Sequence, residues 1–532
     1  MSIRMSYFVN FELAISAALV VMLLPAVSSR VEDAWVESGL ELRLFRDGMN
    51  QPRGMHVLDN GDILIVQRLK GEGNHNVAVA WDDDGDGAAD AVVPILFAPG
   101  SLRANHGIVF HDGYVYASSD TTVWRWTFTP GQRSPGPNSN SAEIVIENMN
   151  ANGRGGAPQG HTTRTLIVGN ESRMYVSVGS AGNVDKDSHR SRIRRFSLLE
   201  FKPGKPFDFQ KGEVFADGLR NEVGLAFDRF GVLWGVENGA DKLKRGDLGG
   251  DIHNDNPAEE LNRFPESSAG KFFGYPYCFT EYKLDHAKAQ GRGGQWSWPY
   301  SKKTDQWCRE NAEPAILAMQ AHSAPLGITF YSGKQSADCE EKRPYALPEE
   351  YIGDAFVAFH GSWNRDIPTG YKIVRIPMNA SGFPVNGAMT DPVDVVRHKG
   401  EGAKWPSNLR PVDVKFDPCG RLYFTSDKNN EMYVIGSLNP APTNSPTAET
   451  PNAITGAPTN DPTTAAPTAS PSSPPSNILE DELRDKDDSD KTGAPAAEIS
   501  DAKRRVQIGI AIGMTCSIAA FIAAVRMLAK YQ

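Results

Sequence analysis

One pattern recurs six times in this chain and limits the folds open to it. It is a loop, an apolar strand, a turn containing Gly, Asn or Asp, and a second apolar strand. In the clearest copy, Val412–Phe424, stretches of alternating polarity flank the turn at Asp417–Gly420. Alternation, a turn and further alternation indicate a β-hairpin. The copies span Pro52–Val66, Asn105–Ser118, Thr163–Gly179, Asn221–Gly239, Pro325–His360 and Pro411–Asp427.

These hairpins predict an all-β fold, because long helical periodicity is almost absent between them. Six hairpin units favour a six-bladed β-propeller over residues 31–438, whose blades stack radially and protect the sheet edges. The fifth copy is stretched by an insertion. A two-sheet sandwich is the weaker alternative, since it normally needs far fewer residues. The length of 532 residues would also allow two to four average domains.

The N-terminal residues are typical of a secretory signal peptide over 1–28. Arg4 supplies a basic flank, Leu13–Leu24 an apolar core, and Ala26-Val27-Ser28 a small-residue cleavage site. An uncleaved anchor is the alternative, because Glu12 lies beside the apolar core. We therefore expect a protein of the secretory pathway, displayed on the extracellular face of the cell.

The C-terminal region predicts a tether. Residues 439–502 are rich in Pro, Thr and Ser and then in acidic residues, which is typical of a disordered stalk. The uncharged run Val506–Val525 is long enough for a transmembrane helix, followed by a short cytoplasmic tail over 526–532. A lipid anchor attached near Ser489 or Gly493 is the alternative.

Charge and cysteine usage narrow the function classes. A net charge of -10 argues against a nucleic-acid partner, which would require a basic face. An oxidising compartment allows three pairings of the four cysteines outside the apolar run, and the sequence does not choose among them. Two glycan acceptor sequons begin at Asn170 and Asn379. The four cysteines are Cys278, Cys308, Cys339 and Cys419.

The loops that precede successive repeats should meet around the channel of a propeller. They carry arginines, histidines and asparagines and no carboxylate, which predicts a cationic pocket for a small anionic ligand. His161, in the segment Gly160-His161-Thr162-Thr163, is the side chain best suited to accept a proton. A hydrated channel lined by structural polar groups is the alternative. The ring comprises Arg53, Asn105, His106, His161, Arg220, Asn221, Asn408 and Arg410.

Two acidic segments are candidate calcium sites, because hard cations take carboxylate and carbonyl oxygens. Glu237–Asp241 ends the fourth repeat, and Glu259 and Glu260 follow it. These two glutamates could instead cap or solvate a short helical turn. The second segment, Asp82–Asp90, resembles an EF-hand loop without its final glutamate, and a solvated acidic turn is its alternative. Its candidate ligands are Asp82, Asp84, Asp86 and Asp90.

Four motifs together resemble the soluble quinoprotein glucose and sorbosone dehydrogenases. They are Gly160–Thr163, Gly218–Asn221, Asn254–Asn262 and Phe359–Arg365, in the order of that family. The run Glu237–Asn262 is most similar to the fungal pyranose dehydrogenases of the group. This resemblance implies a six-bladed propeller that holds pyrroloquinoline quinone (PQQ) and calcium at the mouth of its channel.

The resemblance also implies residue roles. His161 would be the general base, Arg220 and Asn221 would contact the quinone oxygens, and the backbone carbonyls of Gly239 and Ala240 would bind the catalytic calcium. The remaining cofactor-binding residues would be Arg53, Asn105, His106, His360, Trp363, Asn364, Arg365 and Arg410. In this chain Ala240 stands where the bacterial glucose enzymes carry proline, and a backbone ligand tolerates that change.

The function expected is PQQ- and calcium-dependent oxidation of the reducing-end hydroxyl of an aldose or ketoaldose. A sugar is the expected substrate, and the electron acceptor is left open between a quinone, a cytochrome and another carrier. A non-catalytic cell-surface propeller, acting in adhesion or as a receptor, is the first alternative, since a stalk and a membrane span suit it equally. A calcium-dependent propeller lactonase is the second, although that chemistry prefers side-chain carboxylates on a central metal.

Overall fold

The computed structural model describes residues 31–68, 76–97, 103–149, 160–186, 189–336, 339 and 341–439. The predicted signal peptide, the stalk beyond its first residue, the membrane span and the tail lie outside these residues. No helix within the described ranges has the length and apolar character needed to cross a membrane.

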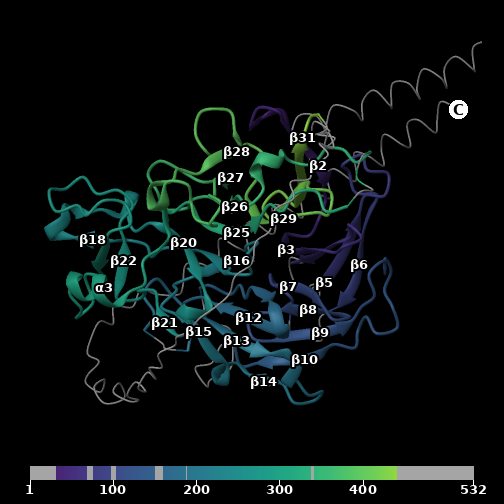
Figure 1. Cartoon of the computed structure of the whole chain (residues 1–532), viewed down its shortest axis with the longest axis horizontal. Helices are drawn as coiled ribbons and strands as arrows, with labels where there is room; N and C mark the ends of the chain where they lie inside the picture. The colour runs from purple at the N-terminus through teal and green to yellow at the C-terminus, as the bar shows by residue number, and fades with distance from the viewer. Residues whose placement is uncertain are drawn as a thin grey trace, which may run out of the picture. The chain divides into compact units, whose positions relative to one another are not determined.

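Six antiparallel blades surround a central channel, which confirms the predicted propeller (Figure 1). Each predicted hairpin is the pair of strands nearest the channel. From the channel outward, the first three blades are β3 (Pro52–Val57), β4 (Ile63–Gln67), β5 (Asn76–Trp81), β6 (Ala91–Phe97); β7 (Ile108–His111), β8 (Tyr114–Ser118), β9 (Val123–Thr127), β10 (Glu143–Glu147); and β11 (Leu166–Val168), β12 (Arg173–Val178), β13 (Arg192–Ser197), β15 (Glu213–Asp217).

The last blade closes the ring with a strand from the N-terminal part of the described chain. Strand β2 pairs antiparallel with β31, from Leu40 opposite Ser437 to Arg46 opposite Met432. The final three blades are β16 (Glu222–Phe227), β17 (Leu233–Glu237), β20 (Glu259–Phe264), β24 (Leu317–Met319); β25 (Pro325–Phe330), β26 (Ala355–Phe359), β27 (Lys372–Ile376), β28 (Val393–His398); and β29 (Pro411–Phe416), β30 (Leu422–Ser426), β31 (Glu431–Ser437), β2 (Leu40–Arg46).

Short elements extend this ring. Strand β1 (Ala34–Val36) lines the outer edge of β28, while β14 (Phe207–Asp208) and β21 (Lys271–Phe272) pair in parallel with β10 and β15. An insertion in two parts extends the fourth blade: β18 (Lys244–Arg245) and β19 (Gly250–Asp251) lie between β17 and β20, and β22 (Cys278–Thr280), β23 (Gln295–Ser297) and α3 (Asp305–Asn311) lie between β20 and β24. It lies at the left of Figure 1.

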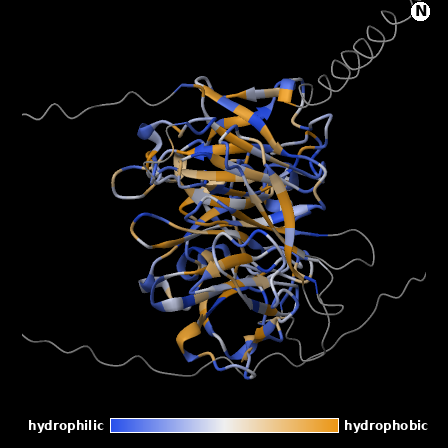
Figure 2. Ribbon diagram, turned by 90° about the vertical axis from the view of Figure 1, so that its right-hand side faces the viewer, coloured by the Kyte–Doolittle hydropathy of each residue, from blue (hydrophilic) through white to orange (hydrophobic). Residues whose placement is uncertain are grey.

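Apolar side chains fill the spaces between neighbouring blades. Trp124 and Trp126 of the second blade pack with Val66 and Val79 of the first, and comparable clusters occupy the other five blade interfaces. The strands accordingly carry much of the hydrophobic colour in Figure 2. Burial at roughly 25 cal/mol per Å² of apolar surface makes these interfaces the main stabilising contribution to the ring.

Two disulfides show which of the three possible cysteine pairings is present in the structure. Cys278–Cys308 joins β22 to α3 within the insertion. Cys339–Cys419 joins the segment between β25 and β26 to the turn between β29 and β30, and so connects the fifth and sixth blades.

Candidate active site

The polar residues predicted to form a ring come from one end of the inner strands. His161 lies ahead of β11, and Arg220 and Asn221 lie directly ahead of β16. Arg53 is the second residue of β3, and Arg410 precedes β29. Since every inner strand starts at the same end of the channel, these loops bring together side chains from distant parts of the sequence.

His161 is held in one tautomer by the loop that follows β12. Its Nδ1 lies 3.0 Å from the carbonyl oxygen and 3.0 Å from the hydroxyl of Ser180. The Ser180 hydroxyl donates its own hydrogen to the Gly182 carbonyl at 2.7 Å, so both partners of Nδ1 are acceptors. Nδ1 therefore carries the proton in the neutral ring, and the Nε2 lone pair is the basic site.

The surroundings of His161 keep it neutral. Burial, with the positive charge of Arg220 as the next cause, lowers its pKa to about 4. Gly179 allows this packing, because a Cβ there would lie 2.4 Å from Oδ1 of Asn221 and 2.9 Å from Cβ of His161. His161 is thus an uncharged base throughout the physiological pH range.

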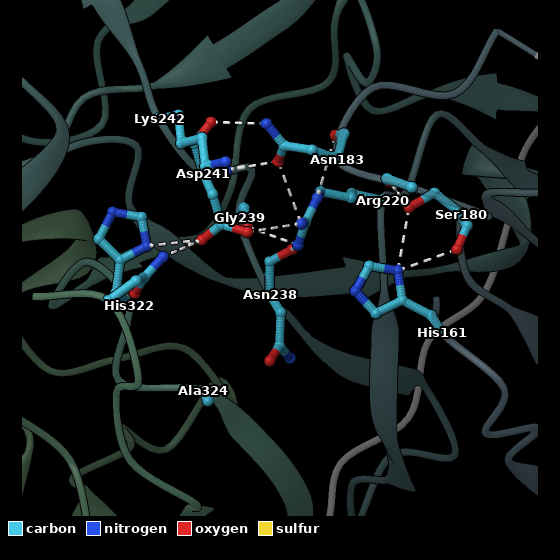
Figure 3. Close-up of polar contacts among 12 residues, drawn as sticks. His161, Ser180, Asn183, Arg220, Asn238, Gly239, Asp241, Lys242, His322 and Ala324 are labelled. Carbon is cyan, nitrogen blue, oxygen red and sulfur yellow. Dashed lines mark hydrogen bonds and ion pairs between the residues drawn. The ribbon is translucent and has the colours of Figure 1, made fainter. Parts of the chain in front are cut away.

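Arg220 is fixed by backbone and side-chain acceptors (Figure 3). Its Nη1 donates to the carbonyls of Gly239 at 2.7 Å and Asn238 at 3.2 Å. Its Nη2 donates to Asp241 at 3.0 Å and to the Asn183 side chain at 3.2 Å. The Gly239 carbonyl, a predicted calcium ligand, therefore already accepts a hydrogen bond in this structure.

Asp241 links this arginine to the other wall of the pocket. Oδ1 of Asp241 lies 3.5 Å from Nδ1 of His322 and accepts a hydrogen bond from Asn364. Burial opposes ionisation of Asp241, but the His322 hydrogen bond and the Arg220 charge outweigh it and lower the pKa to about 2. Burial likewise opposes the charge on His322, whose pKa is raised overall by Asp241 and Glu259. Asp241 is therefore an ionised anchor.

A second carboxylate, Asp427, organises the opposite part of the ring. It accepts from Arg53 at 2.9 Å and lies 2.9 Å from Nε2 of His360. Arg410 donates to the backbone carbonyls of His360 and Gly361. The expectation of a pocket without carboxylates is wrong, because Asp241 and Asp427 enter from the loops that follow second strands.

Asn105 and His106 lie where the ring meets the channel. The Asn105 amide donates to the Thr162 carbonyl at 2.9 Å, while burial, reinforced by Arg53, lowers the pKa of His106 well below its usual range. His106 also borders a cavity of about 320 Å³ that follows the inner strands, with Phe227 and Phe330 among its lining residues. The cavity shows that the channel continues past the ring.

The segment Phe359–Arg365 divides between the site and the surface. His360 and Asn364 contact Asp427 and Asp241, as described above. Arg365 donates to the Ala321 carbonyl and to Asp255, both at 3.1 Å. Trp363, also predicted to bind the cofactor, is 72% exposed and therefore lies at the surface.

Glu259 and Glu260 lie in strand β20 and not on a helical turn. Glu259 is buried and accepts from the backbone N–H groups of Gly239 at 2.7 Å and Ala324 at 3.0 Å. It thereby positions the loop that carries the predicted calcium ligands. Glu260 lies with Glu222 and Glu237 around the Asn262 amide, where burial raises the pKa of all three carboxyls.

The acidic segment Asp82–Asp90 forms the turn between β5 and β6, away from the ring. Asp82, Asp84 and Asp86 bring one carboxylate oxygen each within 4.8 Å of one another. Asp90 instead accepts from the backbone N–H of Asp83 at 2.7 Å. Arg421 already pairs with Asp82 at 2.8 Å, so a cation here would share that carboxylate.

Five residues of the site were missed by sequence reasoning: Arg68, which lies near Arg53 and Asp427, and Ser180, Asn183, His322 and Asp427. A signal existed for three of them. Arg68 comes one residue after β4, Ser180 two residues after β12 and Asp427 one residue after β30, so each follows the second strand of a predicted hairpin. That position faces the same end of the channel as the start of the inner strand. Asn183 and His322 have no comparable pattern in the sequence.

The comparisons with known proteins agree with this arrangement. The TrAA12-like family matches residues 34–438. This chain belongs to that family. A pyrroloquinoline quinone-dependent pyranose dehydrogenase of Coprinopsis cinerea is 29% identical over 432 residues, which cover 75% of this chain and 54% of that protein. The chain thus spans about half the length of this relative.

Other relatives of this TrAA12-like chain match over more of their length. A pyrroloquinoline quinone-dependent sugar dehydrogenase of Hypocrea jecorina is 28% identical over 424 residues, which cover 75% of this chain and 88% of that protein. The holo form of the PQQ domain of the Coprinopsis cinerea pyranose dehydrogenase has a TM-score of 0.62 at 27% identity. The calcium structure of Trichoderma reesei Carbohydrate-Active Enzymes Family AA12 has a TM-score of 0.64 at 26% identity. In both cases the match spans 97% of the solved chain and 76% of this chain.

Proposed function

We propose that this TrAA12-like protein is a PQQ- and calcium-dependent dehydrogenase that oxidises the reducing-end hydroxyl of a pyranose sugar. The names of its relatives suggest the cofactor and the substrate class. The observation that carries the proposal is His161, a neutral histidine with its Nε2 lone pair unprotonated, placed beside Arg220 at the mouth of the channel.

The donors in the ring suit a cofactor with several carboxylates. The buried Nε atoms of Arg53 and Arg68 have no hydrogen-bond partner among the described residues. Buried donors of this kind are costly unless an acceptor reaches them. Arg53, Arg68 and Arg410 would hold the carboxylates of PQQ, with Asn105 and His106 beside them. Arg220 and Asn221 would face its quinone oxygens, as the resemblance implies.

The chain itself supplies binding, orientation and proton transfer. PQQ, when bound, supplies a quinone that accepts a hydride. Nε2 of His161 would take the proton of the hydroxyl whose carbon is oxidised. Nδ1 keeps its own proton and its hydrogen bond to Ser180. The charge of Arg220 disfavours a long-lived imidazolium, which helps His161 to release the proton again. Alignment of base and substrate in a buried pocket contributes further to the rate.

Calcium is proposed at the carbonyls of Gly239 and Ala240, where a cation would polarise a bound carbonyl. The support is chemical: Glu259 fixes the Gly239 backbone, and the ionised Asp241 lies two residues away. Structural calcium remains proposed at Asp82, Asp84 and Asp86, with Asp90 as a further candidate, and at Glu259 and Glu260.

The test is titration of the full chain with PQQ, with and without calcium, followed by dye reduction with a panel of sugars. We expect calcium-dependent binding and turnover. His161→Gln should keep the affinity for PQQ and lower kcat/KM about 10²–10⁴-fold, the range of general-base catalysis. His398→Gln, on β28, is the control and should behave as wild type. Absence of PQQ binding would overturn the proposal and favour the non-catalytic propeller.

A further inference from the structure

The loop between β26 and β27, residues 360–371, exposes two large apolar side chains beside the site. Trp363 is 72% exposed and Ile367 is 75% exposed. Ser362, the residue before Trp363, is buried, and Asn364, the residue after it, contacts Asp241 of the ring. The exposed indole is therefore one residue away in the chain from a side chain that contacts the candidate active site.

This exposure does not come from a loose loop, because both flanks of Trp363 are fixed. The Ser362 N–H donates to the Thr369 carbonyl at 2.9 Å, and the Thr369 N–H donates back to the Ser362 hydroxyl at 3.0 Å. The Tyr371 hydroxyl donates to the Ser362 carbonyl. The Trp363 indole is thus presented to solvent from a backbone with little freedom.

Contacts on the other side of Trp363 connect the loop to the fourth blade. Nε2 of His253 lies 3.1 Å from the Asn364 carbonyl oxygen. The Asp366 N–H donates to Asn254 at 3.1 Å, and the Asn254 amide donates to the Asp366 carboxylate at 2.6 Å. Asp366 is itself exposed and lies three residues from Trp363 in the same loop.

We propose that Trp363 is a platform on which a second pyranose ring stacks, so that the enzyme prefers an oligosaccharide to a monosaccharide. This inference rests on the proposed sugar dehydrogenase function. The flat C–H face of a pyranose packs against an aromatic ring, and the exposed carboxylate of Asp366 in the same loop offers an acceptor to sugar hydroxyl groups. A preorganised indole loses little conformational entropy on binding. The reducing-end unit would then lie at His161.

The test compares binding of methyl β-cellobioside and methyl β-glucoside to the full chain by calorimetry. Neither probe has a free reducing end, so binding is measured without turnover. Wild type should bind the disaccharide about tenfold more tightly, Trp363→Ala should remove that preference, and Trp363→Phe should restore most of it. Ile367→Ala, equally exposed on the same loop, is the matched control and should keep the preference.

Turnover of cellobiose and glucose by the PQQ-loaded full chain provides the second readout. Trp363→Ala should lower kcat/KM for cellobiose about tenfold more than it lowers kcat/KM for glucose. Equal losses for both sugars, or retention of the disaccharide preference in both assays, would overturn the platform. A Trp363→Ala variant in which only the KM for an electron-accepting protein changes would also overturn the platform. If the chain binds no PQQ yet shows the Trp363-dependent glycoside preference, the dehydrogenase proposal fails and the platform stands.

Discussion

His161 obtains its tautomer from a serine loop and not from a neighbouring carboxylate. The Ser180 carbonyl accepts from Nδ1, and the Ser180 hydroxyl is committed to Gly182, so the tautomer is determined by acceptors on one side of the ring. Arg220 contributes charge, while Asp241 compensates Arg220. The proposed base is thus one residue, and the groups that position it are others.

This arrangement predicts the titration of His161. Because burial and Arg220 lower its pKa, the imidazole of the cofactor-free protein should titrate near pH 4 by NMR, well below an exposed histidine. Ser180→Ala should lower kcat/KM of the loaded enzyme less than tenfold, since the Ser180 carbonyl still accepts from Nδ1. Titration near pH 6.5 would contradict the buried, cation-facing environment.

Glu259 predicts a pH dependence of stability. Burial raises its pKa to about 7, against the two N–H groups and the His322 charge that favour ionisation. The folded protein then keeps a proton that an unfolded glutamate releases near pH 4.5. The free energy of unfolding should therefore fall as pH rises from 4.5 to 7, by about 3 kcal/mol from this group.

Urea unfolding of Glu259→Gln and wild type between pH 4.5 and 8 measures this contribution. The amide that replaces the carboxyl group would lose one backbone hydrogen bond, so the variant should be less stable at low pH but show a shallower pH dependence than wild type. Glu350→Gln, at the surface, is the control and should keep the wild-type profile. Parallel profiles for Glu259→Gln and wild type would show that Glu259 is ionised throughout.

At the scale of elements, the inner strands approach one another through small residues at one level of the channel. A Cβ on Gly54 would lie 2.1 Å from the His106 carbonyl oxygen, and one on Gly107 would lie 2.2 Å from that of Arg164. On β29 the same level is occupied by Asp413, whose carboxylate accepts from the Met55 N–H at 2.9 Å. Backbone therefore meets backbone around the ring.

Gly54→Ala should consequently push β3 away from β7. We expect a loss of about 2–4 kcal/mol in the free energy of unfolding, the usual range for overpacking against rigid backbone. PQQ affinity should also fall, because Arg53 adjoins this position. The control is Gly246→Ala, where a Cβ meets nothing within 4 Å and the backbone is not left-handed. Equal free energies of unfolding for the two variants would mean that β3 and β7 can move apart at little cost.

Local sequence patterns predict the hairpins and the positions of the ring residues, but not the contacts between blades. Alternation and turn residues identify all six inner hairpins, because both depend on local backbone geometry and one buried face. They also locate the ring residues, since each lies within five residues of the start of its inner strand. They do not predict that Asp427 pairs with Arg53, 374 positions away in the chain, or that Asn183 anchors Arg220. Those contacts depend on how blades pack.

At the scale of the whole molecule, the ring depends on its closure. Strand β2 supplies the outer strand of the sixth blade and buries Leu40, Leu42 and Phe45. Without this pairing, β31 would have an open edge and the interface between the first and sixth blades would lose Phe45. Because each blade packs on two neighbours, a weakened closure should affect every interface.

Leu42→Ala tests this dependence. Leu42 is 6% exposed, so truncation should lower the free energy of unfolding by about 2–4 kcal/mol, while Leu199→Ala, at a site 75% exposed, should change it by less than about 0.5 kcal/mol. Circular dichroism and tryptophan fluorescence should still report one shared urea transition, because closure supports the ring as a unit. If an early transition separates in Leu42→Ala alone, the sixth blade unfolds independently. Stability would then be local to each pair of blades, and closure would matter only to the first and last.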